Sequence, residues 1–177
     1  KDKEHEDMGA LILDFNGDGN LDLFVVSGGV ECQSGDPVLQ DRMYLNKGGG
    51  NLERASEQFF PPIRESGSIA AACDFDRDGD LDLFVGSRVI PGKYPLSPNS
   101  HLYINEGSHF KVATHQVLPG FSLMGLVTSA LWSDADNDGW MVTPGAADPP
   151  PSLRFRSRGP VQVCVKTNVF LQRGIQR

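Results

Sequence analysis

The stretch DFNGDGNLDLFVV (residues 14–26) is the most informative part of the sequence, because it recurs with few changes as DFDRDGDLDLFVG (residues 74–86). A shorter version, DADNDGW, occupies residues 134–140. The three copies begin at Asp14, Asp74 and Asp134, so the chain repeats with a period of 60 residues. A period of this length indicates an architecture of similar units stacked side by side.

Each unit alternates apolar and acidic residues in the way a β-strand does. Leu23 and Val25 point to one face of an extended strand, while Asp22 points to the other. A second element, an apolar-Tyr-apolar-Asn run followed by a Gly-containing turn, appears at residues 43–50 and 102–108. The expected unit is strand, acidic loop, strand, long connection, strand, turn, strand, which is typical of a four-stranded propeller blade.

The predicted fold is therefore all-β, a partial β-propeller of about three four-stranded blades of roughly 60 residues each. Propellers close with about four to eight blades, so three blades form an arc of a larger ring. We expect propeller repeats over residues 1–139, with blade units around 9–67, 68–126 and 127–139. Residues 140–177 are expected to form a divergent tail rich in Pro and Arg, or a degenerate blade end.

Composition narrows the class of protein. Of the 177 residues, 39% are apolar and 22% are charged, which is ordinary for a globular chain. The net charge of −7 is local, because the three loops hold 11 of the 23 acidic residues. No apolar run is long enough for a membrane-spanning helix, and the opening KDKEHEDMGA is too charged for a signal peptide.

The first two loops follow the pattern D-x-[DN]-x-D-G-x-x-D, which offers oxygen ligands at alternate positions and a Gly at the sharp turn. Oxygen donors without His or Cys favour Ca²⁺ over Mg²⁺ or Mn²⁺, which demand stricter geometry. Without a cation the clustered carboxylates repel one another. The candidate ligands are Asp14, Asn16, Asp18, Asn20 and Asp22 in the first loop, and Asp74, Asp76, Asp78, Asp80 and Asp82 in the second.

The third loop keeps half of the pattern. Asp134, Asp136 and Asp138 are candidate ligands, but Trp140 and Val142 stand where the other loops carry later ligands. We therefore expect two calcium sites and regard the third as doubtful.

An EF-hand is the main alternative for such a loop. It requires flanking helices and a bidentate Glu at position 12, whereas that position is Val25 in the first loop and Val85 in the second. Both loops also run directly into a β-like Leu-Asp-Leu-Phe-Val segment. The EF-hand interpretation fails on both points.

The segments DFNGDGNLDLFV, DFDRDGDLDLFVGSRVIPGKYPLSP, HLYINEGSHF and LVTSALWSDADNDGW resemble the FG-GAP or VCBS repeats of integrin-α-like propellers, closest to the cartilage acidic protein and ASPIC/UnbV-associated group. The resemblance covers residues from about 8 to 140. It implies an extracellular or periplasmic propeller, usually of about seven blades, with structural Ca²⁺ in the loops of one face. A literal Phe-Gly and Gly-Ala-Pro pair is not evident, so the loops are more similar to the VCBS type.

The function favoured by the sequence is a non-enzymatic, calcium-binding recognition or adhesion module. Its expected partners are an extracellular protein or glycan and the remaining propeller blades. The long connections 28–41 and 88–100 are the candidate contact surfaces. The alternative is a fragment of a secreted propeller lyase or hydrolase, but no catalytic motif accompanies the histidines at 5, 101, 109 and 115. The Arg run at 154–158 lacks an aromatic platform, so no nucleic-acid partner is expected.

Overall fold

The chain is described by a computed structural model over residues 4–114, 125–132 and 164–167. In this part of the chain, two antiparallel four-stranded sheets dominate the fold. Sheet one contains β1 (Glu6–Leu13), β2 (Asp22–Gly28), β3 (Arg42–Asn46) and β4 (Leu52–Arg54) in sequence order. Sheet two contains β5 (Ser66–Cys73), β6 (Asp82–Val89), β7 (His101–Asn105) and β8 (Phe110–Val112), also in sequence order.

The two sheets repeat one another in topology and register. Leu23 pairs with Tyr44 across β2 and β3, and Leu83 pairs with Tyr103 across β6 and β7. Each acidic loop joins the first two strands of its sheet, and a short 3₁₀ helix, η1 (Pro37–Leu39), lies in the β2–β3 connection. The all-β prediction and the predicted element order are confirmed.

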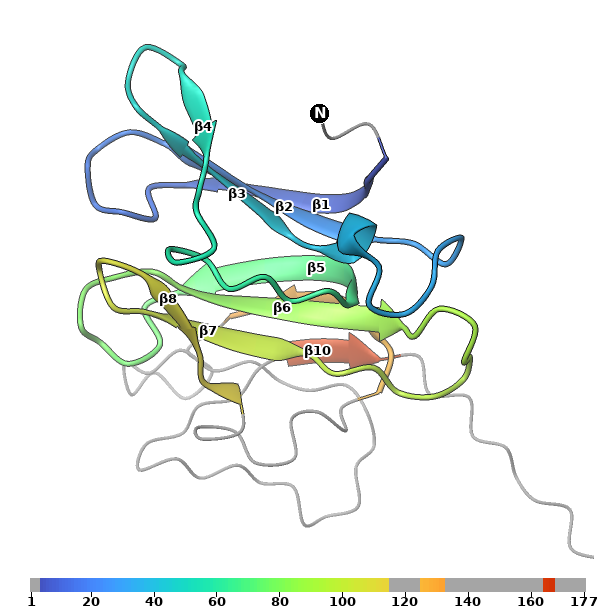
Figure 1. The fold of residues 1–177 in the computed structure, drawn as a ribbon. Helices are drawn as coiled ribbons and strands as arrows, with labels where there is room; N and C mark the ends of the chain where they lie inside the picture. Colours follow the sequence, from blue (N-terminus) through green and yellow to red (C-terminus); the bar gives the residue numbers. More distant parts are fainter. Residues whose placement is uncertain (1–3, 115–124, 133–163, 168–177) are drawn as a thin grey trace, which may run out of the picture.

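The sheets lie one above the other, with the acidic loops at one end and the long β2–β3 and β6–β7 connections at the other (Figure 1). The core between them forms because residues of β2 and β3 pack against residues of β6, β7 and β8. It includes Phe15, Phe24, Val26, Met43, Phe60, Leu83, Val85, Tyr103 and Phe110.

A second core lies on the other side of sheet two. Phe84, Leu102 and Ile104 pack there against Val127 and Trp132. Val127 begins β9 (Val127–Leu131), which pairs antiparallel with β10 (Cys164–Thr167). A strand of the 140–177 segment therefore pairs with the strand that follows sheet two.

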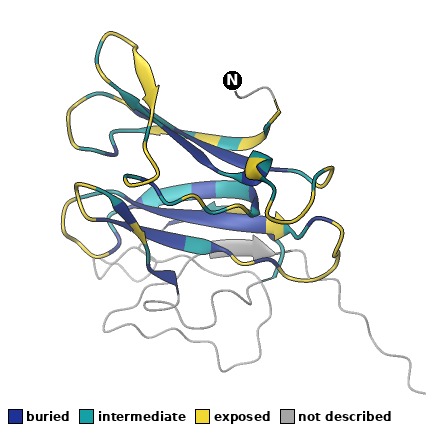
Figure 2. Cartoon of the chain, viewed as in Figure 1, coloured by how far each residue is buried: buried dark blue, intermediate teal, exposed yellow. Residues whose placement is uncertain are grey.

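The central strands are consequently buried on both faces, as the dark ribbon of β6 and β7 shows (Figure 2). By contrast, β4 at the edge of sheet one is exposed along its length. Such burial distinguishes stacked blades from a single sheet with one wet face. Cys73, at the end of β5, is buried in the second core.

Glycine allows the sheets to approach closely at two equivalent places. A Cβ on Gly67 would meet Val26 Cγ1 at 2.4 Å, and a Cβ on Gly86 would meet Val127 Cγ1 at 2.4 Å. Residue 86 lies one period after residue 26, and residue 127 one period after residue 67. The two interfaces therefore have equivalent contacts between a valine and a glycine, but the strand position that supplies the valine in one interface supplies the glycine in the other.

Candidate metal site

Both acidic loops have the sharp turn that the pattern predicts. The glycines at position 6, Gly19 and Gly79, have φ of 85° and 98°. This left-handed conformation is accessible to glycine without the steric cost that other residues meet. It turns the backbone so that the side chains at positions 1, 3 and 5 lie inside one loop.

The second loop brings three carboxylates into a compact group. Ligand atoms of Asp74, Asp76 and Asp78 all lie within 4.8 Å of one another. The backbone N–H of Gly79 donates to Asp74 Oδ2 (3.2 Å), and that of Asp80 donates to Asp78 Oδ1 (2.9 Å). These bonds hold the loop and leave the other carboxylate oxygens directed at one volume.

The electrostatics of this group are unfavourable without a cation. Asp74 Oδ1 is buried and has no hydrogen-bond partner. Burial, followed by the charge of Asp78, raises the pKa of Asp76. A buried, unpartnered carboxylate oxygen costs free energy that a divalent cation would offset. Hard oxygen donors at this spacing are the ligands that Ca²⁺ prefers.

The first loop has the same shape but satisfies its carboxylates internally. The side-chain amides of Asn16 and Asn20 donate to Asp18 at 3.1 and 3.0 Å. The N–H of Gly19 donates to Asp14 Oδ2 at 2.9 Å. The backbone N–H of Asn20 and the Asn16 side chain lower the pKa of Asp18. The two loops therefore differ in how strongly an ion would be needed.

The aspartates at position 9 bind the backbone. Asp82 Oδ2 accepts from the N–H of Phe75 (2.7 Å) and its Oδ1 from the N–H of Asn105 (2.8 Å). Asp22 makes the same two bonds, to Phe15 (3.0 Å) and Asn46 (2.8 Å). Burial raises the pKa of Asp82 to about 6, although both N–H donors act to lower it. Sequence reasoning identified Asp22 and Asp82 as possible ligands and missed this clamp between loop and strand.

A further residue that sequence reasoning missed is Asn105. Its side-chain Nδ2 donates to the carbonyl of Phe15 in the first acidic loop (2.8 Å) and to the carbonyl of Leu81 in the second acidic loop (3.3 Å). Its Oδ1 accepts from the N–H of Gly107 and closes the β7–β8 turn. The recurring Tyr-x-Asn signal was present in the sequence, but its contact with a loop 90 residues away was not visible there.

The third predicted loop, with Asp134, Asp136 and Asp138, lies outside the described residues. His115 lies outside them as well.

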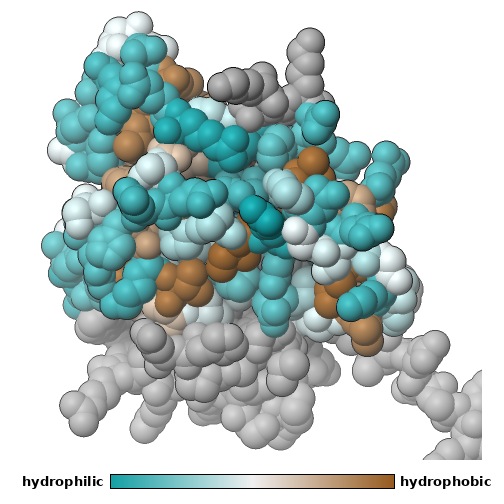
Figure 3. Space-filling model, in the orientation of Figure 1, coloured by the Kyte–Doolittle hydropathy of each residue, from teal (hydrophilic) through white to brown (hydrophobic). Residues whose placement is uncertain are grey.

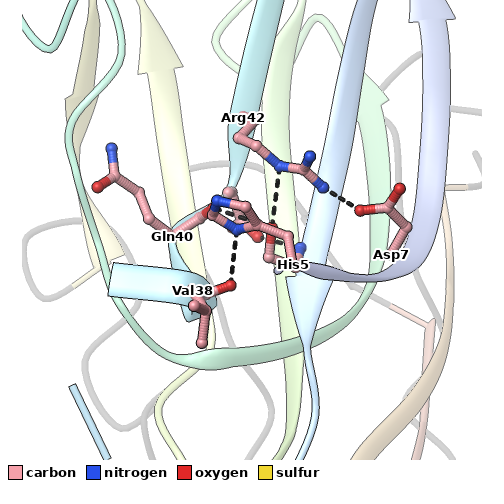
Figure 4. Close-up of polar contacts among 7 residues, drawn as sticks. His5, Asp7, Val38, Gln40 and Arg42 are labelled. Atoms are coloured by element: carbon pink, nitrogen blue, oxygen red, sulfur yellow. Dashed lines mark hydrogen bonds and ion pairs between the residues drawn. The ribbon is translucent and has the colours of Figure 1, made fainter. Parts of the chain in front are cut away.

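The described histidines occur in three separate places. His5 Nδ1 lies 2.7 Å from the carbonyl of Val38, beside the ion pair of Arg42 with Asp7 (Figure 4). His101 Nε2 is 3.3 Å from Glu65 Oε2, without the alignment of a hydrogen bond. His109 contacts Ser108 Oγ (3.2 Å) and Glu106 (3.3 Å) on an exposed turn. The Ser108, His109 and Glu106 side chains bring together a hydroxyl, an imidazole and a carboxylate. These side chains are exposed to solvent, so they lack the water-excluding surroundings that strengthen electrostatic interactions in an active site.

A small cavity of about 220 Å³ lies beside the start of β3. Asp41, Arg42, Arg54 and Phe60 are among its lining residues. Burial raises the pKa of Asp41 to about 8, and Glu65 acts in the same direction. The space-filling view shows a mostly hydrophilic surface with separate hydrophobic patches (Figure 3).

The sheets and loops together define a partial β-propeller built from acidic-loop blades. Residues 14–85 match the FG-GAP-like repeat family. The match begins at the first acidic loop and ends within β6, so it includes both complete loops. A search of curated proteins finds no match to the sequence. Within the described residues, no helix is long and apolar enough to cross a membrane.

Proposed function

We propose that this chain is a calcium-stabilised, non-enzymatic propeller module that recognises an extracellular protein or glycan. The observation that carries the calcium assignment is the group formed by Asp74, Asp76 and Asp78 within 4.8 Å, with a buried Asp74 oxygen that has no hydrogen-bond partner. A divalent cation replaces repulsion among these carboxylates with attraction. The ion would hold the loop rigid and carry out no chemistry.

The recognition surface is proposed at the end of the molecule opposite the acidic loops. The long connections there expose the apolar side chains of Val30, Tyr94 and Leu96. Exposed apolar side chains on loops held by a rigid sheet suit contact with a partner. The similarity of the loops to VCBS repeats supports kinship with the cartilage acidic protein and ASPIC/UnbV-associated group. It also supports an extracellular or periplasmic location and a complete ring of about seven blades.

Thermal unfolding with and without calcium tests the calcium assignment. We expect Ca²⁺ to raise the Tm of the full chain, since a ligand that binds only the folded state at about 100 times its Kd adds about 2.7 kcal/mol. Asp78→Asn should remove most of this rise, whereas Glu53→Gln, an exposed acid on β4, should leave it intact. Equal melting curves with calcium and with chelator would refute the assignment.

A further inference from the structure

A single side-chain amide bonds both acidic loops, which lie at the same end of the neighbouring sheets (Figure 1). Asn105 ends β7 and is 1% exposed. Its Nδ2 donates to the carbonyl of Phe15 (2.8 Å), at position 2 of the first loop, and to the carbonyl of Leu81 (3.3 Å), at position 8 of the second. The two hydrogens of this buried amide are therefore divided between the two loops.

At the first loop, the amide holds the backbone between two candidate ligands. The N–H of Phe15 donates to Asp22 Oδ2 (3.0 Å), and its carbonyl accepts from Asn105. These bonds fix the peptide groups before and after Phe15, to which Asp14 and Asn16 are attached. The ring of Phe15 is 1% exposed, so it anchors the same residue in the core. The arrangement of positions 1 and 3 therefore depends on where Asn105 lies.

At the second loop, Asn105 is also fixed through its backbone. Its N–H donates to Asp82 Oδ1 (2.8 Å), and Asp82 Oδ2 accepts from the N–H of Phe75 (2.7 Å), at position 2 of that loop. The bond to the Leu81 carbonyl adds a second connection. A shift of the second loop would therefore move the Asn105 amide, and with it the backbone of the first loop.

We infer that Asn105 couples the two acidic loops, so that a cation bound in one loop raises the affinity of the other. This inference rests on the proposed calcium binding and specifies how its two sites act together. Ion binding orders an acidic loop, which costs conformational entropy. A loop whose backbone is already held by an ordered neighbour loses less entropy when it binds, and the coupling is reciprocal. Asn105 is a positioning residue here, since its side chain is directed at backbone groups.

Repulsion between two bound cations acts in the opposite direction. Salt screens this repulsion, with a screening length of about 8 Å at physiological ionic strength. The hydrogen bonds of Asn105 are buried, so salt affects them much less. We therefore expect ordering to determine the sign of the coupling at physiological salt.

Asn46 is the equivalent residue of sheet one and provides a matched control. Its Nδ2 donates to the Leu21 carbonyl (3.1 Å), its Oδ1 accepts from the N–H of Gly48 (3.0 Å), and its N–H donates to Asp22 Oδ1 (2.8 Å). Asn105 makes the same three kinds of contact within its own blade. Among the described residues, the bond to the loop of the other blade distinguishes Asn105 from Asn46.

Calorimetric titration of the full chain with Ca²⁺, carried out as a mutant cycle, tests the inference. Asp78→Asn disables the second loop, and the event that Asp18→Asn then removes belongs to the first. With Asn105 present, we expect Asp78→Asn to weaken calcium binding at the first loop about fivefold or more. With Asn105→Leu, which has a similar shape and no donors, the same change should alter this affinity by less than about twofold. With Asn46→Leu the fivefold effect should remain.

Hydrogen exchange provides a second measurement with the native Asn105, because Asn105→Leu leaves two carbonyls without their donor. In the Asp18→Asn chain, at a calcium concentration that fills the second loop, we expect slower amide exchange at residues 15–20 of the first loop. Unchanged exchange there, with the second loop filled, would overturn the inference.

The titrations separate this inference from the calcium assignment. Independent affinities of the two loops, or a first ion that weakens the second, would overturn the coupling and leave calcium binding intact. Coupling that survives Asn105→Leu, or that Asn46→Leu removes equally, would show that Asn105 only packs the blades together. The absence of saturable binding in every chain would overturn both the coupling and the calcium assignment.

Discussion

At the residue scale, one aspartate in each repeat joins three segments of the blade. Asp82 accepts hydrogen bonds from the loop at Phe75 and from the end of β7 at Asn105, while its own backbone begins β6. Because both N–H groups would otherwise be orphaned in the interior, this clamp contributes more than an exposed carboxylate would.

Replacement of Asp82 should therefore be costly even without metal. In the presence of a chelator we expect Asp82→Ala to lower the free energy of unfolding by about 2–5 kcal/mol, since it leaves two buried backbone N–H groups without an acceptor. Asp80→Ala should change it by less than about 0.5 kcal/mol under the same conditions. Urea unfolding measures both. Equal losses for the two variants would show that Asp82 acts only as a ligand.

The buried carboxyl group of Asp41 should make the stability of the fold depend on pH. Its pKa in the fold is raised to about 8, because the carboxyl is buried and lies near Glu65. The folded state therefore keeps a proton that the unfolded state releases above about pH 4, so this stabilisation is full below that pH and is lost as pH rises toward 8. The equivalent residue of sheet two, Ser100, accepts from Ser87 N–H in the way Asp41 accepts from Ser27.

Asp41→Ser should remove this dependence while it preserves a hydroxyl acceptor for Ser27. Between pH 5 and pH 8, we expect the wild type to lose on the order of 3–4 kcal/mol more stability than the variant. Urea unfolding at the two pH values gives the comparison. Parallel losses in both proteins would mean that Asp41 is ionised across this range.

At the scale of elements, the exchange of Val and Gly between the two interfaces sets how closely the sheets pack. Val26 meets Gly67 between sheets one and two, and Gly86 meets Val127 between sheet two and β9. A side chain larger than hydrogen at either glycine would require the sheets to separate, because interiors are close-packed.

Exchanging Gly67 and Val26 together should destabilise the fold less than replacing Gly67 alone. We expect Gly67→Val alone to destabilise by about 2 kcal/mol or more through overpacking. Adding Val26→Gly should recover part of the loss, with a coupling energy of about 1–3 kcal/mol. Urea unfolding of both single variants and the double variant completes the cycle. Purely additive effects would contradict a direct contact.

The strands were predictable because their chemistry is local. Alternating residues, acidic loops and Gly-rich turns specify the order of β1 to β8 without knowledge of their neighbours. Burial of both faces was not predictable, because Asp22 and Asp82 suggest a polar face until their backbone partners are known. The pairing of β9 with β10 could not be predicted, because the sequence after the third acidic loop no longer follows the repeat.

At the scale of the whole molecule, the acidic loops lie at one end of the arc of blades and the long β2–β3 and β6–β7 connections lie at the other (Figure 1). The shape of the two acidic loops was predictable from the spacing of their aspartates and glycines. The difference between them was not, because it depends on which oxygens find donors: the Asn side chains satisfy Asp18, whereas Asp74 Oδ1 is left without a partner. The second loop should therefore depend more on its ion than the first.

Calorimetric titration of the full chain with Ca²⁺ measures whether the two acidic loops bind the ion. We predict saturable binding that Asp78→Asn abolishes at the tighter site, while Asp18→Asn weakens a separate and weaker event. Glu53→Gln should leave the titration unchanged. The absence of saturable calcium binding at millimolar concentration, or binding that survives Asp78→Asn and Asp18→Asn together, would show that these loops are not calcium sites.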